Sequence, residues 1–92
     1  MKPGIQNTLS PHTTIFYKLQ ARSHVTLTVF DALGRLIATL VNEVEEQGDK
    51  SVNFNANGLA SGEYWYQLFV RIAGQNGKSK SCTKREKLLS LK

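Results

Sequence analysis

Side chains that could catalyse a reaction or hold a metal are few in this sequence of 92 residues, and they lie far apart along it. The two histidines, His12 and His24, have no third ligand at the spacing that a zinc site needs, and Cys82 is the only cysteine. Ser61 precedes a glycine but lacks the flanking glycines and the strand–turn–helix setting of a nucleophile elbow. These residues therefore do not point to a nucleophilic or metal-dependent enzyme.

Carboxylates offer a second kind of chemistry, since two of them flanking a glycosidic bond can hydrolyse it. Asp31 with Asp49 or Glu63 would make such a pair, but turn chemistry explains Asp31 better. In "DALGRL" its side chain can cap a turn, and Gly34 can take the left-handed conformation that closes a hairpin. Phosphate-binding glycine loops do not occur in the sequence. We expect no catalytic residue, no cofactor and no metal.

Aromatic and basic side chains favour binding over catalysis. Trp65 and Phe69 occupy outward positions of "EYWYQLFV", where they would stack on a sugar ring or pack against a neighbouring domain or loop. The formal net charge is +5, and residues 78–92 account for all of it. Such an end either faces a partner or is an edge strand that lysines keep from self-pairing. Because the aromatics and these bases lie mainly in different segments, we expect no nucleic-acid binding.

Apolar and polar residues alternate with a period of two along most of the chain, and turn signals recur every 8–12 residues. This pattern predicts an all-β sandwich or barrel of six to seven antiparallel strands. The six expected strands are residues 13–19, 24–31, 35–42, 50–55, 63–72 and 80–91, and the seventh would lie near residues 5–9. We expect residues 10–92 to form one domain, preceded by a linker or short edge strand over residues 1–9.

The connections between these strands have different characters. Residues 35–42 carry apolar side chains on both faces, which indicates a strand buried on both sides or a β-bulge. We interpret the acidic residues 43–50 as an exposed connection, and "ANGLASG" as an ordered loop in which Leu59 enters the core. Asn76-Gly77 is a strong hairpin signal.

The sequence contains no apolar run near the roughly 20 residues of a membrane span, so we expect no membrane insertion. Its first residues lack the apolar core of a secretory leader, so we expect any export signal to lie upstream. The single cysteine excludes an internal disulfide framework.

Four segments occur in an order that resembles a known family: "PHTTIFYKL", "HVTLTVFDALGRLIATLV", "GLASGEYWYQL" and "KLLSLK". Together they are similar to the type A C-terminal sorting domain of cargo proteins of the type IX secretion system. The resemblance covers the chain from about Ser10 to Lys92. A related immunoglobulin-like domain with the same Gly-x-Tyr-x-Tyr-x-Leu strand occurs in flagellar hook-capping proteins.

The resemblance implies an immunoglobulin-like β-sandwich that directs a larger exported protein through the outer-membrane translocon of that system. It implies passage through the periplasm to the cell surface or the medium, where a sortase-like peptidase usually removes the domain and cargo is anchored. The partners implied are these components and an upstream cargo domain of the same chain. By resemblance, the structural motif of the family falls on Asp31, Gly34, Arg35, Gly62, Tyr64 and Tyr66. The recognition signal falls on Lys87, Leu88, Leu89, Leu91 and Lys92.

An accessory module of an extracellular enzyme is the alternative interpretation. In that case the sandwich would be a spacer, or would contact carbohydrate or protein through Trp65 and Phe69.

Overall fold

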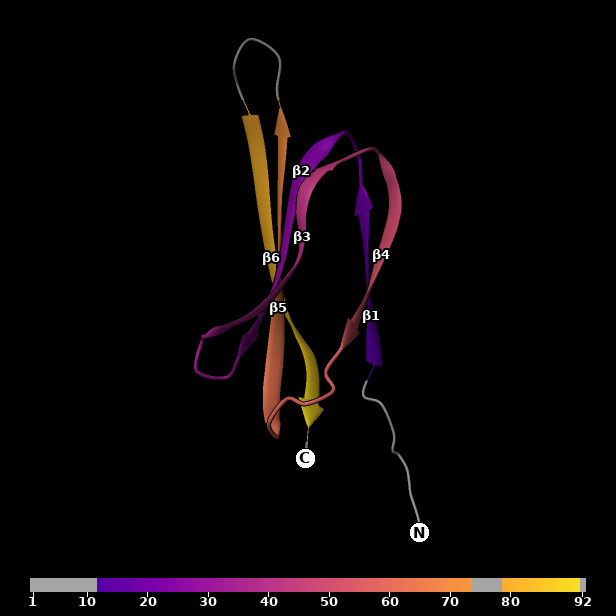
Figure 1. The fold of residues 1–92 in the computed structure, drawn as a ribbon. Coiled ribbons are helices and arrows are strands. Elements are labelled where there is room, and N and C mark those ends of the chain that lie inside the picture. Colours follow the sequence, from indigo (N-terminus) through magenta and orange to yellow (C-terminus); the bar gives the residue numbers. More distant parts are fainter. Residues whose placement is uncertain (1–11, 74–78, 92) are drawn as a thin grey trace.

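The chain folds into six β-strands in a computed structural model that describes residues 12–73 and 79–91 (Figure 1). The strands are β1 (His12–Leu19), β2 (Ser23–Asp31), β3 (Leu36–Glu45), β4 (Gly48–Asn55), β5 (Gly62–Ala73) and β6 (Ser79–Leu91). They form a two-stranded sheet, β1-β4, and a four-stranded sheet, β3-β2-β5-β6, both antiparallel. The predicted all-β sandwich is therefore confirmed. The possible strand at residues 5–9 and the turn at Asn76-Gly77 lie outside the described residues.

The core lies between the two sheets and follows the alternation of the sequence. On β2, every second side chain is fully buried: Val25, Leu27 and Val29. Val25 and Leu27 pack with the buried Ile15 and Leu19 of β1, and Val29 packs with the buried Phe54 of β4. β-branched and aliphatic side chains suit this pleated surface, and burying each one stabilises the fold by about 1.5–3 kcal/mol.

Strand β3 contains the irregularity that its two-sided apolar pattern predicted. The pairing of β2 with β3 shifts register twice, between Leu27 and Thr28 and between Val29 and Phe30. Each shift leaves one residue of β3 without a partner opposite it, and these residues are Leu40 and Ile37. Both are half-buried against the core, which a regular strand would have allowed for only one of them. The bulge interpretation is therefore confirmed.

The interpretation of residues 43–50 as an exposed connection is wrong. Strand β3 continues to Glu45 and β4 begins at Gly48, so that only residues 46 and 47 connect the two sheets. The stretch extends the sheet because Glu45 pairs with Ser23 of β2. Most of its acidic side chains point to solvent from strand positions. The Tyr17 hydroxyl donates to Glu45 Oε1 at 2.5 Å and ties β1 to this end of the molecule.

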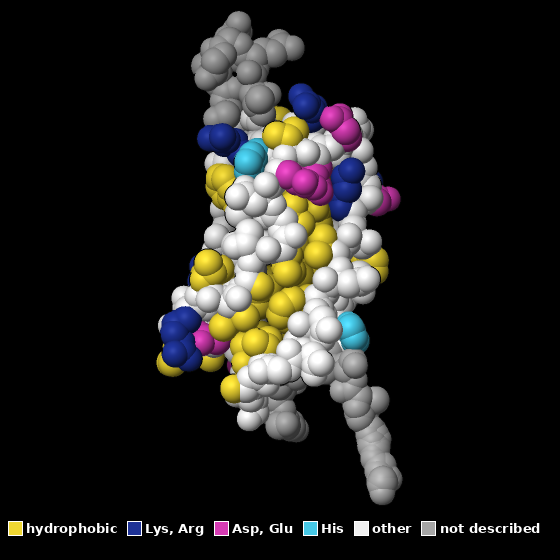
Figure 2. Space-filling view, viewed as in Figure 1, with side chains coloured by type: hydrophobic (Ala, Val, Ile, Leu, Met, Phe, Trp, Pro, Cys, Tyr) yellow, Lys and Arg dark blue, Asp and Glu magenta, His cyan; other side chains and the backbone are white. Residues whose placement is uncertain are grey.

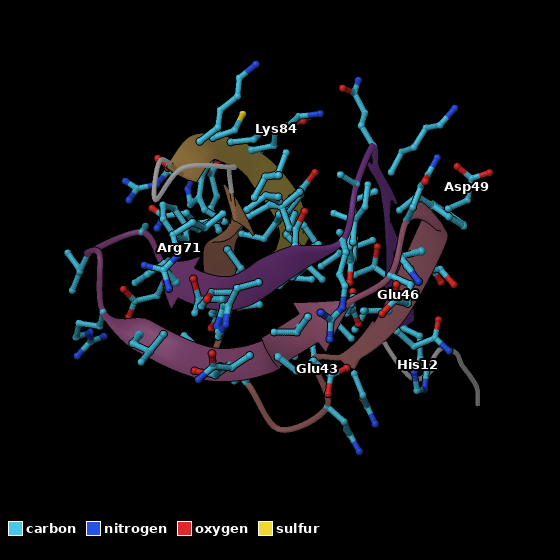
Figure 3. All side chains as sticks on the ribbon, turned by 90° about the horizontal axis from the view of Figure 1, so that it is seen from above. His12, Glu43, Glu46, Asp49, Arg71 and Lys84 are labelled. Carbon is cyan, nitrogen blue, oxygen red and sulfur yellow. The ribbon has the colours of Figure 1, made fainter. Side chains whose placement is uncertain are left out.

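Seen from above, β1 and β4 lie together on one side of the four-stranded sheet (Figure 3). Two strands cannot cover four, so the sides of the sandwich stay partly open. On the face seen in Figure 2, apolar side chains form a stripe that runs along the length of the molecule. Half-buried residues at the margin of the core, rather than fully buried ones, therefore line the openings between the sheets. Among the described residues, no helix is long and apolar enough to cross a membrane.

Candidate recognition strand and its surroundings

Strand β6 carries four of the twelve basic residues of the chain, Lys80, Lys84, Arg85 and Lys87, and forms one edge of the four-stranded sheet (Figure 1). It pairs antiparallel with β5 from Ala73 opposite Ser79 to Gly62 opposite Leu91. Its other edge pairs with no strand among the residues that the structure describes. The backbone groups on that edge are therefore in position to pair with an added strand.

The two faces of β6 follow from its register with β5. Lys84 stands opposite Leu68, whose side chain points into the sandwich, and so lies on the inner face. Arg85 and Lys87 stand opposite Gln67 and Trp65 on the outer face. Basic side chains thus project from both faces of this edge strand.

The inner face of β6 holds a small polar cluster. Lys84 Nζ lies 2.7 Å from Glu86 Oε2, and the Tyr66 hydroxyl lies 3.5 Å from the same oxygen. The hydrogen bond from Lys84 lowers the pKa of Glu86, and the same contact raises the pKa of Lys84. Burial, followed by the neighbouring Glu86 carboxylate, raises the pKa of Tyr66. All three groups are held in the form present at neutral pH, so the cluster has no group poised to transfer protons.

Salt bridges and hydrogen bonds fix the outer face of β6. Lys87 Nζ lies 3.3 Å from Glu63 Oε2, and Arg85 donates to Gln67 Oε1 at 2.5 Å. The Lys87–Glu63 pair is about half exposed, so it contributes less than about 1 kcal/mol. A partner can therefore replace it at little cost.

The end of β6 combines exposed and half-buried side chains. Leu88 packs against both parts of the core, and Leu89 packs against the part formed by Val29, Phe54 and Tyr64. Leu91 belongs to β6 and pairs with Gly62, whereas Lys92 lies outside the described residues. Four of the five predicted recognition residues therefore lie on a paired edge strand, and two of them, Leu88 and Leu89, help to hold that strand on the core.

The hairpin between β2 and β3 places the motif residues Asp31, Gly34 and Arg35 together. Asp31 Oδ1 accepts hydrogen bonds from the backbone N–H groups of Leu33, at 3.0 Å, and Arg35, at 2.9 Å. Arg35 Nε donates to Asp31 Oδ2 at 2.7 Å. These bonds, the backbone N–H of Arg35 foremost, lower the pKa of the Asp31 carboxyl. Gly34 has a φ of 84°, so the predicted left-handed turn is confirmed.

The motif residues Gly62, Tyr64 and Tyr66 begin strand β5. The buried Tyr64 reaches back four residues, where its hydroxyl donates to the carbonyl oxygen of Ala60 at 2.6 Å. This contact resembles the tyrosine corner of immunoglobulin-like sandwiches, which pins a loop to the strand that follows it. Leu59 of the same loop packs against the core, as the sequence predicts. Tyr64 thus joins this loop to the core through its ring and its hydroxyl group.

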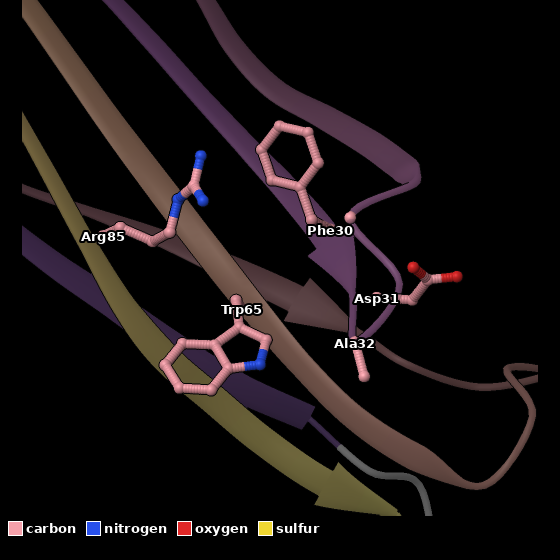
Figure 4. A pocket seen from close by; sticks show the side chains of 6 residues that line it. Phe30, Asp31, Ala32, Trp65 and Arg85 are labelled. Atoms are coloured by element: carbon pink, nitrogen blue, oxygen red, sulfur yellow. The ribbon is translucent and has the colours of Figure 1, made fainter.

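The outward aromatics of β5 have a partner that sequence reasoning missed. Trp65 lines a shallow hollow of about 380 Å³, together with Phe30 of β2 and Arg85 of β6 (Figure 4). The Arg85 guanidinium lies 5.6 Å from the centre of the Phe30 ring, which is within cation–π range. Phe69 lies on the same face but does not line the hollow. The register of three neighbouring strands brings these residues together, and no motif marks it.

Of the enzyme candidates, Asp31, Ser61 and Glu63 line one hollow of about 190 Å³. His24 Nε2 lies 2.9 Å from Asn42 Oδ1 on the outer sheet surface, and His12 is exposed at the start of β1. Within residues 12–73 and 79–91, three or more His, Cys, Asp or Glu side chains nowhere gather as a metal site would require. Both carboxylate oxygens of Asp31 accept hydrogen bonds within its own turn, and the Glu63 carboxylate forms a salt bridge with Lys87. Asp49 does not line the hollow that Asp31 and Glu63 share.

Comparison with known sequences gives one result. The family described as "Secretion system C-terminal sorting domain" matches residues 10–84, which is most of the chain. The match ends before the last six residues, where the resemblance of the sequence had placed the recognition signal. Searches of curated proteins and of solved structures give no match.

Proposed function

Because this chain belongs to the family of secretion system C-terminal sorting domains and carries a type IX sorting signal, we propose that the end of β6 is where the signal is read. The proposed recognition residues are Lys87, Leu88, Leu89, Leu91 and Lys92. The family assignment implies export, a surface or extracellular fate, contact with the secretion machinery and an upstream cargo region. The role of the domain in that process is to be bound rather than to catalyse.

The position of β6 at a sheet edge supports this proposal. A receptor strand can pair with the free edge through backbone hydrogen bonds, while alternate side chains provide specificity. Lys87 is about half exposed, and its salt bridge to Glu63 is weak enough for a receptor carboxylate to replace it. The bases would also speed the encounter with an acidic receptor.

The half-buried leucines couple this signal to folding. Leu88 and Leu89 contact the core, so Lys87 takes a fixed position only when the sandwich is formed. A receptor that reads this spacing would therefore distinguish a folded domain from an unfolded one.

The route after recognition completes the proposal. We propose that the outer-membrane translocon accepts the domain from the periplasm, and that a sortase-like peptidase then separates it from the upstream cargo. The cleavage would leave the cargo at the cell surface or in the medium.

Export of a reporter fused upstream of the chain tests the proposal. Removing residues 87–92, or neutralising Arg85, Lys87 and Lys92 together, is expected to retain the reporter in the periplasm. The matched control neutralises Arg22, Lys50 and Arg71, which lie on other strands or connections. Circular dichroism of each purified domain establishes that it is folded. Normal export of the folded β6 variants would refute the assignment.

A carbohydrate-binding module is the second candidate, and the hollow beside Trp65 is the observation that favours it. An indole ring beside an arginine can stack on a sugar ring and donate hydrogen bonds to its hydroxyl groups. Glycan-array binding that is lost in Trp65→Ala and retained in Phe16→Ala, an exposed aromatic on β1, would support this function. Absence of binding to any glycan would exclude the carbohydrate-binding function.

A further inference from the structure

A groove runs between β1 and the inner face of β5 and β6, on the side of the molecule away from the recognition residue Lys87. Its volume is about 340 Å³, and its lining is mainly apolar. Leu68, Val70 and Ile72 of β5 form one wall, and Leu19 of β1 forms part of the other. The three β5 side chains are only half-buried, so the sandwich leaves this apolar surface in contact with solvent.

The groove is open because the smaller sheet ends at β1. Strand β1 pairs with β4 along one edge, and its other edge pairs with no strand in the described part of the chain. Residues of β1 line the groove, whereas β4 does not contribute, so the groove lies beside this unpaired edge. Strands in a sheet are about 4.8 Å apart and packed sheets about 10 Å apart. A third strand beside β1 would therefore lie directly over Leu68 and Val70.

The rim of the groove is cationic. Lys18 of β1 and Lys80 and Lys84 of β6 line it, and no carboxylate does so among the described residues. Lys84 also lines a neighbouring hollow with Lys18 and Lys50, so its side chain reaches toward β1, as Figure 3 shows. Glu86 neutralises part of the Lys84 charge through their 2.7 Å contact, whereas no salt bridge involves Lys18 or Lys80 within the described residues.

A second copy of the chain does not suit this rim. Each chain has a formal net charge of +5, so two such rims repel each other. Lys80 and Lys84 also occupy inner-face positions of an edge strand, opposite Ile72 and Leu68. Natural sheets use inward-pointing charges of this kind to prevent edge-to-edge self-pairing.

We propose that this groove accepts an extended acidic segment of a partner protein, which adds to the free edge of β1 as a third strand. Alternate apolar side chains of the segment cover Leu68, Val70 and Ile72. Its carboxylates lie between Lys18 on one side and Lys80 and Lys84 on the other. The groove is separate from the outer face and free edge of β6, so this site does not depend on where the sorting signal is read.

A fluorescein-labelled nine-residue peptide that alternates glutamate and valine is the probe, and its lysine–valine counterpart is the control. Fluorescence anisotropy with the full chain is expected to show saturable binding of the glutamate peptide alone. Lys80→Glu is expected to weaken this binding about tenfold, because it replaces an attraction by a repulsion. Arg71→Glu changes the charge equally at a nearby position on the outer face of β5, and should leave binding unchanged.

Two measurements on the unaltered chain make the test independent of variants. Cys82 lines the groove and is exposed, so bound peptide should slow its alkylation by iodoacetamide at least fivefold. Hydrogen exchange should slow at backbone amides of β1, because strand addition pairs them. Equal weakening by Lys80→Glu and Arg71→Glu, or unchanged exchange in β1, would overturn the proposal. So would self-association of the chain that competes with the peptide in sedimentation velocity.

Discussion

Replacing Tyr64 by phenylalanine tests whether the family motif stabilises the fold through one hydroxyl group. The substitution keeps the buried ring in place beside Val29 and Phe54 and removes only the donor to the Ala60 carbonyl. That hydrogen bond is short, at 2.6 Å, and fixes the loop before β5. Tyr66→Phe is the matched control, because its hydroxyl is 3.5 Å from an exposed Glu86 carboxylate.

The size of the effect follows from the two geometries. A neutral hydrogen bond contributes about 0.5–1.5 kcal/mol net, and this short, partly buried bond belongs near the middle of that range. We expect Tyr64→Phe to lower the free energy of unfolding by about 1 kcal/mol, which for a domain of this size lowers Tm by about 4–8 °C. A 3.5 Å contact at the surface contributes little, so Tyr66→Phe should change stability by less than about 0.5 kcal/mol.

Urea denaturation followed by Trp65 fluorescence provides the assay. The dependence of free energy on urea should stay the same in both variants, because neither changes the surface exposed on unfolding. The reasoning fails if Tyr64→Phe matches the wild-type midpoint, or if Tyr66→Phe is equally destabilised. The first result would mean that Tyr64 acts through ring packing alone, and the second that its hydroxyl contributes no more than the exposed hydroxyl of Tyr66.

Three further predictions concern the turn and the core. The pKa of Asp31 is lowered, so the stability that its carboxylate contributes is complete at neutral pH and is lost as pH falls through the folded pKa. The urea midpoints of wild type and Asp31→Asn should therefore differ at pH 7 and converge in acid, where the Asp31 carboxyl is protonated. Gly34→Ala places a residue with a Cβ atom at a φ of 84° and should lower the free energy of unfolding by about 1–2 kcal/mol in the same denaturation assay. Leu27→Ala removes a fully buried side chain and should lower the free energy of unfolding by about 2–5 kcal/mol. Leu33 is 78% exposed, so Leu33→Ala should change this free energy by less than about 0.5 kcal/mol; calorimetry compares the two variants.

The strands and the turn at Asp31 could be predicted because local sequence determines them. Val25, Leu27 and Val29 alternate with threonines, and only one pairing register places all three in the core. An aspartate three residues before a glycine similarly specifies its own turn, because the hydrogen bonds that close it come from within the same loop.

Residues 43–50 show where that reasoning fails. Four acidic residues and a glycine look like a loop, since charged residues have low strand propensity. The stretch is nevertheless mostly strand, because β2 offers a pairing edge as far as Ser23 and the acidic side chains can point to solvent. Long-range pairing decided the outcome, and no local signal reports it.

The hollow beside Trp65 and the groove beside β1 could not be predicted either, because both depend on long-range pairing. Each is assembled from strands that are distant in sequence. Phe30, Trp65 and Arg85 meet through two strand registers, and Lys18 and Lys80 line one groove because the smaller sheet ends at β1. A sequence shows which residues share a strand face, but which faces stay uncovered depends on how many strands each sheet contains.

The position of the basic residues on β6 bears on how a folded domain can serve as a signal. A disordered tail would present the same lysines at many spacings and would lose entropy when a receptor fixed them. On β6 that entropy has already been lost in folding, because Leu88 and Leu89 hold the strand on the core. Destabilising the core should therefore reduce recognition even when every basic residue is intact. Export of a Leu27→Ala fusion should recover at a temperature at which the domain refolds, whereas export of a chain without residues 87–92 should not.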